Sequence, residues 1–122
     1  FRIVKSQPLQ WSVVAVDLDP VVGSEQAGRR PVIVVSRESA NAVLPVVSAL
    51  PLTTQKKGRR VYPNEALLPK GAGGLARESI AMAHQLRTLS KKRLGKKIGR
   101  IDDTEIRSAI KTAMRIQLDL DS

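Results

Sequence analysis

Short apolar runs rich in β-branched residues recur along most of the chain, and polar stretches containing glycine or proline separate them. Runs of this length, closed by turn residues, are typical of β-strands. The pattern predicts five strands, at residues 11–18, 31–36, 43–52, 61–68 and 78–83, with the last continuing into residues 85–88. Residues 37–42 are polar and can form a single helical turn.

The last segment carries a helical periodicity. Asp102 is a suitable N-cap, and Glu105 three residues later completes a capping box,. The spacing predicts a helix over residues 103–119. Its cationic stripe, formed by Arg107, Lys111 and Arg115, is either a solvated surface or a contact for a partner. Apolar residues recur on another face at three- and four-residue intervals, at Ile106, Ala109, Ile110, Ala113, Met114 and Leu118.

Five strands followed by one helix predict a mainly β, α+β fold, in which the helix packs on a compact, partly closed antiparallel barrel. The 122 residues suit one domain,, and no internal repeat or linker divides residues 1–122. Residues 1–10 precede the first predicted strand and are interpreted as an N-terminal extension of that domain.

Rare residue types narrow the chemistry. The chain has no cysteine and one histidine, His84, which excludes thiolate nucleophiles, disulfides and multi-histidine metal sites within one protomer. We therefore expect no metal site and no cofactor. One Phe, one Trp and one Tyr are too few for the base-stacking platforms of domains such as the RRM.

The charge indicates anionic partners. Lysine and arginine number 21 against 11 acidic residues, which gives a net charge of +10. Nucleic acid, an acidic protein and an anionic membrane surface all fit this charge. No apolar run reaches the ~18–20 residues of a membrane span, and residues 1–10 lack the apolar region of a signal peptide, so we expect a cytoplasmic protein with no membrane partner.

Two predicted loops concentrate polar side chains. Arg30 immediately precedes the second strand, and Thr53 immediately follows the third. If these two strands pair antiparallel, Arg30 and Thr53 lie near each other on rigid strand ends. The first loop also holds Ser24, Glu25, Gln26 and Arg29, and the second holds Lys56, Lys57, Arg59 and Arg60.

An arginine beside a hydroxyl group suits a phosphodiester. A guanidinium binds phosphate oxygens in bidentate fashion, and preorganised donors stabilise the charge that develops on a phosphorane. In RNA the 2′-hydroxyl can be the nucleophile, so the protein has to assist only the proton transfers. Arginine, with a pKa above ~12, is a poor base, which leaves Glu25 or a water molecule.

Each of these residues also has a purely structural interpretation. Glu25 can pair with Arg29 or Arg30 and order its loop. Thr53 can be a turn hydroxyl, residues 56–60 can form a solvated loop, and His84 can be a half-buried strand or interface residue.

Three blocks, taken together, resemble one known family. Residues 16–36, V-D-L-D-P-V-V-G-S-E-Q-A-G-R-R-P-V-I-V-V-S, strongly resemble the signature region of the MazF/PemK family of toxin endoribonucleases. Residues 51–58, P-L-T-T-Q-K-K-G, are similar to the family's P-x-T-T-Q-x-x-G segment, and residues 77–88, R-E-S-I-A-M-A-H-Q-L-R-T, are similar to its third block. The blocks occur in the family's order and spacing, and the resemblance spans nearly the whole chain.

The resemblance implies a homodimeric toxin with an SH3-like barrel that cuts single-stranded RNA or mRNA at short specific sequences without a metal. The products would be a 2′,3′-cyclic phosphate and a 5′-hydroxyl, and the inhibitor would be an acidic, partly disordered MazE-like antitoxin. The family's catalytic pair corresponds to Arg30 and Thr53, and Glu25 is a further catalytic candidate. The RNA contacts predicted from the loops and the resemblance together are Ser24, Gln26, Arg29, Lys56, Lys57, Arg59, Arg60, Ser79, His84, Gln85 and Arg87.

The chain departs from the family pattern at two places. Trp11 and Ser12 replace the Gly-Asp that commonly opens the first strand, and His84 stands where relatives often have an acidic residue. Two other functions remain as alternatives. One is a CcdB-like gyrase poison built on the same barrel, and the other is a non-catalytic basic module that binds nucleic acid by charge alone.

Overall fold

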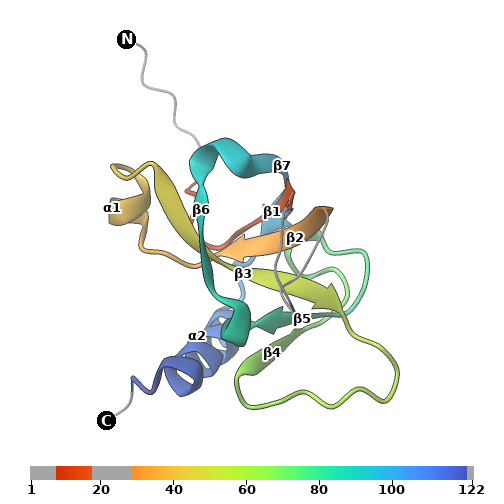
Figure 1. Cartoon of the computed structure of the whole chain (residues 1–122). Coiled ribbons are helices and arrows are strands. Elements are labelled where there is room, and N and C mark those ends of the chain that lie inside the picture. The colour runs from red at the N-terminus through yellow and green to blue at the C-terminus, as the bar shows by residue number, and fades with distance from the viewer. Residues whose placement is uncertain (1–7, 18–28, 121–122) are drawn as a thin grey trace.

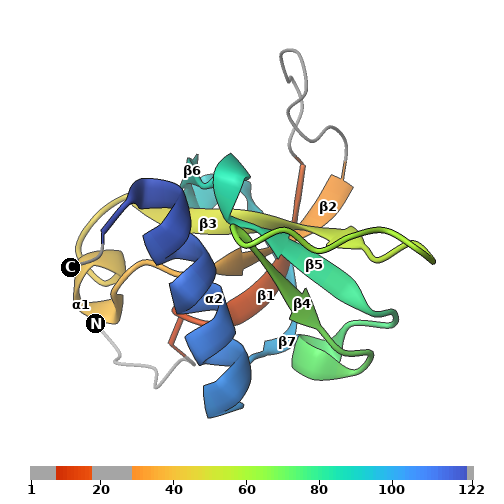
Figure 2. The same cartoon turned by 90° about the horizontal axis from the view of Figure 1, so that it is seen from below.

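The computed structural model describes residues 8–17 and 29–120, which form a strongly bent antiparallel sheet with one long helix against it (Figures 1 and 2). The strand order is β4-β5-β3-β2-β1-β7, and β6 pairs with β3 as well. The mainly β, α+β fold predicted from the sequence is confirmed. The strands are β1 (Ser12–Asp17), β2 (Arg29–Val34), β3 (Val46–Thr54), β4 (Glu65–Leu68), β5 (Ser79–Met82), β6 (Arg87–Ser90) and β7 (Leu94–Arg100). The helices are α1 (Glu38–Asn41) and α2 (Thr104–Leu118), with short 3-10 turns η1 (Ala72–Gly74), η2 (Ala83–Gln85) and η3 (Lys91–Arg93).

Five of the strands enclose a small apolar interior. Strand β1 pairs with β2 and β7, and β3 pairs with β2 and β6. The three-residue turn η3 connects β6 to β7 and so joins the two ends of this set. This arrangement is the partly closed barrel that the sequence predicts. Its interior is formed by Val14, Val16, Val32, Val34, Val47, Ala49 and Leu89, with Leu9 and Leu94 packed against them.

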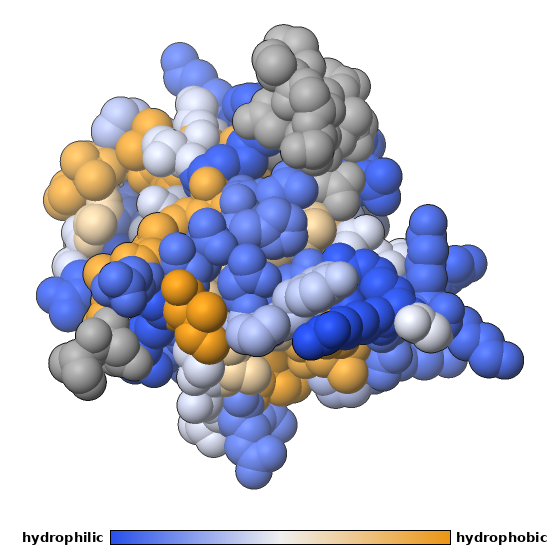
Figure 3. All heavy atoms as spheres, turned by 60° about the horizontal axis from the view of Figure 1, so that its bottom comes forward, coloured by the Kyte–Doolittle hydropathy of each residue, from blue (hydrophilic) through white to orange (hydrophobic). Residues whose placement is uncertain are grey.

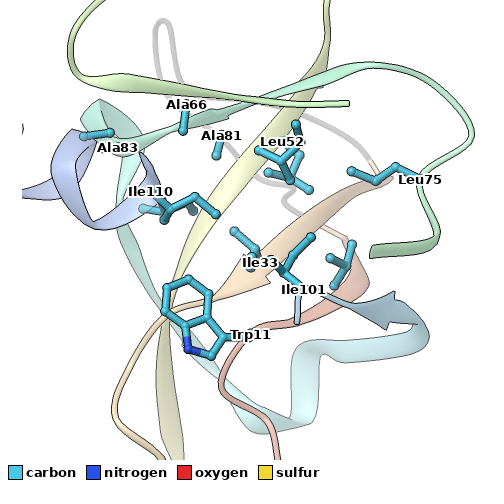
Figure 4. Close-up of a cluster of buried hydrophobic side chains, with 13 residues drawn as sticks. Trp11, Ile33, Leu52, Ala66, Leu75, Ala81, Ala83, Ile101 and Ile110 are labelled. Atoms are coloured by element: carbon cyan, nitrogen blue, oxygen red, sulfur yellow. The ribbon is translucent and has the colours of Figure 1, made fainter. Parts of the chain in front are cut away.

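The opposite side of the central strands carries the larger core (Figure 4). Alternate residues of a strand project to opposite faces, so Ile33 and Leu50 face this core while their neighbours face the barrel interior. Helix α2 covers the core with Ile110 and Ala113, which are fully buried. The 15-residue α2 is amphipathic, and no helix among the described residues is long and apolar enough to cross a lipid bilayer.

The strand count differs from the prediction. The described residues hold seven strands rather than five, because the stretch predicted as one strand through residue 88 is broken by η2 into β5 and β6. Strand β7 was not predicted. Its sequence, LGKKIGR, has the burial pattern of a largely exposed strand, so it lacks the alternation of apolar and polar residues on which the prediction depends.

The start of α2 corrects a second prediction. The N-cap is Asp103, not Asp102: a carboxylate oxygen of Asp103 accepts the backbone N–H groups of Glu105 and Ile106 at 2.8 and 3.1 Å. Asp102 instead accepts hydrogen bonds from the guanidinium groups of Arg100 and Arg107. The sequence offers two adjacent aspartates, and these arginines engage the first one.

Trp11 has a backbone conformation that glycine ordinarily supplies. Its φ is +70°, which is costly for a residue with a Cβ. The backbone is fixed on both sides, since its N–H donates to Val34 (2.7 Å) and its carbonyl accepts from Ile101 (2.8 Å). The indole is 5% exposed, and the cationic groups of Arg107 and Lys111 lie 5.3 and 5.9 Å from its ring centre. Trp11 therefore occupies a backbone conformation that glycine adopts most readily,.

Candidate active site

Arg30 projects toward the interior side of the barrel, at the end where β2 begins. In an antiparallel pair, directly opposed residues project to the same side of the sheet. Val16 is opposed by Arg30 on β2 and by Leu94 on β7, and both Val16 and Leu94 contact the barrel interior. Arg30 is exposed, so its side chain lies at the open end of this interior.

Thr53 lies at the same end of the neighbouring strand. Val32 on β2 pairs with Pro51 on β3; Arg30 lies two residues before Val32, and Thr53 lies two residues after Pro51. The two residues therefore extend from the same end of an antiparallel pair and share its inward side. The strand pairing on which the sequence prediction depended is confirmed. Thr53 is half-buried, and on the other edge of β3 it pairs with Ile80 of β5.

Arg87 joins the same side from β6. Ala49 is opposed by Val34 on one edge and by Arg87 on the other, which directs Arg87 inward with Val34. The Nε of Arg87 is buried and donates to no acceptor. A buried donor without a partner costs free energy, so this group is suited to an acceptor that a ligand supplies.

Two hydrogen bonds of Gln55 hold the loop that follows β3. The backbone N–H of Gln55 donates to Glu78 (2.9 Å), and its amide Nε2 donates to the carbonyl of Arg59 (3.0 Å). Lys56 and Lys57 are exposed between these two anchors. The predicted RNA-binding lysines are thus presented to solvent by a loop whose two ends are fixed.

Arg59 and Glu65 form a second anchor that the sequence analysis missed. The Arg59 guanidinium donates to both carboxylate oxygens of Glu65, at 3.1 and 2.8 Å. These hydrogen bonds lower the pKa of Glu65. Burial raises this pKa, while the backbone N–H of Tyr62 and the electrostatic interactions with Arg59 and His84 lower it further. Because the Arg59 guanidinium already has this partner, its predicted RNA contact stays a prediction.

A hollow of about 610 Å³ lies beside this ion pair. It is lined by residues of the β3–β4 loop, by His84 of η2 and by Ile116 and Gln117 of α2. His84 is exposed and lies in η2, so its interpretation as a half-buried strand residue is wrong, whereas an interface role stays a prediction. The guanidinium of Arg60 lies 5.2 Å from the ring centre of Tyr62 at the edge of the same loop.

The remaining predicted contacts are distributed around the catalytic candidates. Ser79 is 5% exposed and donates to the carbonyl of Arg77 (2.9 Å), and it lines a hollow of about 330 Å³ together with Pro31 and Thr54. Gln85 is half-buried in η2. Arg29 is exposed at the start of β2, opposite Asp17. Ser24, Glu25 and Gln26 lie outside the described residues.

Comparison with known proteins places the chain in one family. Residues 9–118 match the family model described as PemK-like, MazF-like toxin of type II toxin-antitoxin system. The chain is 36% identical over 110 residues to endoribonuclease MazF9 of Mycobacterium tuberculosis, which covers 86% of this chain and 91% of the relative. It is also 36% identical over 104 residues to endoribonuclease EndoA of Bacillus subtilis, covering 85% and 88%.

Solved structures agree with the sequence comparison. An endoribonuclease in complex with its cognate antitoxin, from a mycobacterial species, superposes with a TM-score of 0.77 at 27% identity and covers 95% of this chain and 99% of that one. MazF from Deinococcus radiodurans superposes with a TM-score of 0.75 at 26% identity and covers 93% and 97%. With a family model that spans most of its length and relatives matched almost end to end, this chain belongs to the PemK/MazF family of type II toxin–antitoxin toxins.

Proposed function

We propose that this protein is a sequence-specific, metal-independent endoribonuclease toxin that cleaves single-stranded RNA in the cytoplasm. The observation that carries the proposal is the placement of Arg30 and Thr53 on one side and at one end of the paired strands β2 and β3. Family membership supports it, since the relatives described above are named endoribonucleases.

The proposed reaction begins with attack of an RNA 2′-hydroxyl on the adjacent phosphorus. Arg30 donates hydrogen bonds to the non-bridging oxygens as negative charge accumulates on the phosphorane, and the Thr53 hydroxyl donates to the same group. The P–O5′ bond then breaks and leaves a 2′,3′-cyclic phosphate and a 5′-hydroxyl. Glu25 or a water molecule takes the 2′ proton, and a water molecule donates the proton that the departing 5′-oxygen gains. Arg87 is a further donor to the phosphate group.

The experiment is cleavage of a long single-stranded RNA in the presence of EDTA. Arg30→Ala and Thr53→Val should each lower the cleavage rate by about 10²–10³-fold, because each removes a donor to the transition state. Arg37→Ala and Thr112→Val are matched controls at exposed positions outside the predicted site and should cleave normally. Binding of a uniformly 2′-O-methylated RNA, which has no nucleophile, should change little in any variant.

Four outcomes would each overturn this assignment or part of it. Catalytic-pair variants that cut as fast as their controls would remove Arg30 and Thr53 from the mechanism, and cleavage lost in EDTA would contradict metal independence. Intact RNA with trapped DNA–gyrase complexes would select the CcdB-like alternative. RNA binding that collapses with salt, with no strand scission, would leave only a basic binding module.

The proposal includes a homodimer. Large exposed apolar side chains lie after α1 and along the C-terminal part of α2, and both elements are on the same flank of the molecule (Figures 1 and 2). Hydrophobic surface gathers toward this flank in Figure 3, and contiguous apolar patches favour a protein interface. Light scattering should give twice the chain mass, and Leu118→Lys with Val43→Lys should lower it. The exposed apolar side chains of this flank are Val43, Leu44, Ile116, Leu118 and Leu120.

The proposal also includes an acidic antitoxin. Solved relatives include a toxin bound to its cognate antitoxin, and an acidic segment that folds on binding suits the exposed Lys56 and Lys57. An antitoxin that inhibits cleavage should displace RNA from the toxin. Simultaneous binding of both at these loops would contradict this part of the proposal.

A further inference from the structure

Residues 91–100, KKRLGKKIGR, hold six cationic residues and no acidic residue. Five of them, Lys91, Lys92, Arg93, Lys96 and Lys97, lie in η3 and the first half of β7, and we call these five residues the basic edge. None was assigned an RNA contact from the sequence. The ion pairs Arg59–Glu65, Arg100–Asp102 and Arg107–Asp102 include none of the four lysines of this edge.

The basic edge lies at the boundary of the sheet. Among the described residues β7 pairs with no strand other than β1, and η1 packs against its far half at Ile98 and Gly99. Lys96 and Lys97 are both exposed. Lysines on an edge strand can serve simply to prevent association with another strand, so the position of this edge relative to Arg30 decides between that role and ligand binding.

Three residues that oppose one another across β2, β1 and β7 fix the position of the basic edge relative to Arg30. Val16 of β1 is opposed by Arg30 on one side and by Leu94 on the other. Neighbouring strands are about 4.8 Å apart, so the backbone of Leu94 is about 10 Å from that of Arg30. Lys96 and Lys97 follow two and three residues later on the same strand.

Two contacts make the positive surface continuous. The guanidinium of Arg93 donates to the carbonyl of Asp17 at the end of β1. At Gly95, a Cβ would lie 3.7 Å from a terminal nitrogen of Arg29, the neighbour of Arg30. Arg29 therefore bridges the space between the basic edge and the proposed catalytic arginine.

We propose that the basic edge binds the sugar–phosphate backbone of the RNA strand beyond the scissile nucleotide, and this inference rests on the proposed function. Charge complementarity supports a polyanion. The edge suits a phosphate chain better than an acidic peptide strand, because the register between β1 and β7 shifts twice, at Val13/Val14 and Val14/Val16. Such irregularities twist an edge and hinder the addition of another strand, whereas lysine–phosphate contacts need no regular backbone ladder.

The test compares Lys96→Gln/Lys97→Gln with a matched control pair, Lys111→Gln/Arg115→Gln, which removes two cations from the solvent-facing side of α2. Both variants carry the same net charge. Binding of a uniformly 2′-O-methylated single-stranded RNA is measured against KCl concentration. Each lost phosphate contact should lower the slope of log affinity against log salt by about 0.7, so the edge variant should lose about 1.4 and the control close to none.

Cleavage then separates the two proposals. With a short RNA at saturating enzyme, the edge variant should cut at the wild-type rate, because its lysines bind the flanking backbone only. An unchanged salt slope, or equal losses in both variants, would overturn the basic edge as an RNA site. If the edge variant binds oligo-glutamate more weakly than wild type but binds RNA unchanged, the basic edge is a site for an acidic protein instead. If the wild-type protein cuts no RNA but the salt slope of the edge variant is still lower than that of the control variant, the nuclease proposal is overturned and the basic edge remains an RNA site.

Discussion

The guanidinium of Arg59 holds the carboxylate of Glu65 through two hydrogen bonds, and the two side chains differ sharply in exposure, at 31% for Arg59 and 2% for Glu65. Glu65 also accepts the backbone N–H of Tyr62 at 3.0 Å. The buried carboxylate thus fixes the far end of the β3–β4 loop, and the near end begins after Thr54, the neighbour of Thr53 at the end of β3.

Arg59→Ala should destabilise the protein by about 1–3 kcal/mol, because it leaves a buried carboxylate without its charged partner. Arg60→Ala is the matched control: Arg60 is exposed, and its guanidinium lies over the face of Tyr62, so loss of this side chain should cost less than about 1 kcal/mol. Urea unfolding gives both free energies. Equal effects in the two variants would show that the Arg59–Glu65 pair adds nothing to stability.

The same ion pair predicts a loss of stability in acid. The folded-state pKa of Glu65 lies below its ordinary value of 4.5, chiefly through the Arg59 hydrogen bonds. A lowered carboxyl pKa stabilises the fold fully above the unfolded-state pKa, and that contribution disappears as pH falls through the folded-state pKa. Glu65→Gln should therefore be less stable than wild type at pH 7, with the difference narrowing below about pH 4. A difference that stays constant with pH in urea titrations would contradict this.

The backbone conformation and burial of Trp11 predict an unusual order of stability among its variants. Its φ of +70° suits glycine, whereas its buried ring fills space beside Ile33 and Ile110 (Figure 4). Removing the ring should cost about 3–5 kcal/mol, but Gly also relieves backbone strain of about 1–2 kcal/mol. Trp11→Gly should then be more stable than Trp11→Ala, with Trp11→Phe above both. Thermal unfolding that places Ala above Gly would show that the backbone there is not strained.

The sequence predicts those parts of the fold that depend on local periodicity. The helical spacing of Ile106, Ile110 and Ala113 marks α2, and the β-branched runs mark β1 to β3. The antiparallel pairing of β2 and β3, which brings Arg30 and Thr53 to one end, follows from chain order and confirms the expectation.

Contacts between distant segments are what the sequence could not reveal. Strand β7 is stabilised by pairing with β1 rather than by an apolar pattern of its own. Arg59 stands in a basic run typical of a solvated loop, and only its folded position opposite Glu65 makes it an anchor. The N-cap of α2 is Asp103 rather than the predicted Asp102, because Asp102 forms ion pairs with Arg100 and Arg107.

That last correction can be tested directly. Asp103→Ala removes the acceptor for two backbone N–H groups at the start of α2 and should cost about 1 kcal/mol. Asp102→Ala breaks only ion pairs in which the Asp102 side chain is 75% exposed, and should cost less. Urea unfolding of both variants checks the order, and a larger effect for Asp102 would restore the sequence-based assignment of the cap.

Gly99 packs without a side chain against the turn that supports the far half of β7. A Cβ there would lie 2.3 Å from the carbonyl oxygen of Gly73 and 2.9 Å from the backbone nitrogen of Gly74. Both obstacles are backbone atoms, so neither can rotate away, and Gly99→Ala should cost about 2 kcal/mol or more through displacement of β7 from η1. Gly58 provides the contrast: its φ is +81°, yet a Cβ would meet open space, so Gly58→Ala should cost only the backbone strain of about 1–2 kcal/mol. If unfolding shows Gly99→Ala to be the milder change, β7 and η1 are not in this close contact.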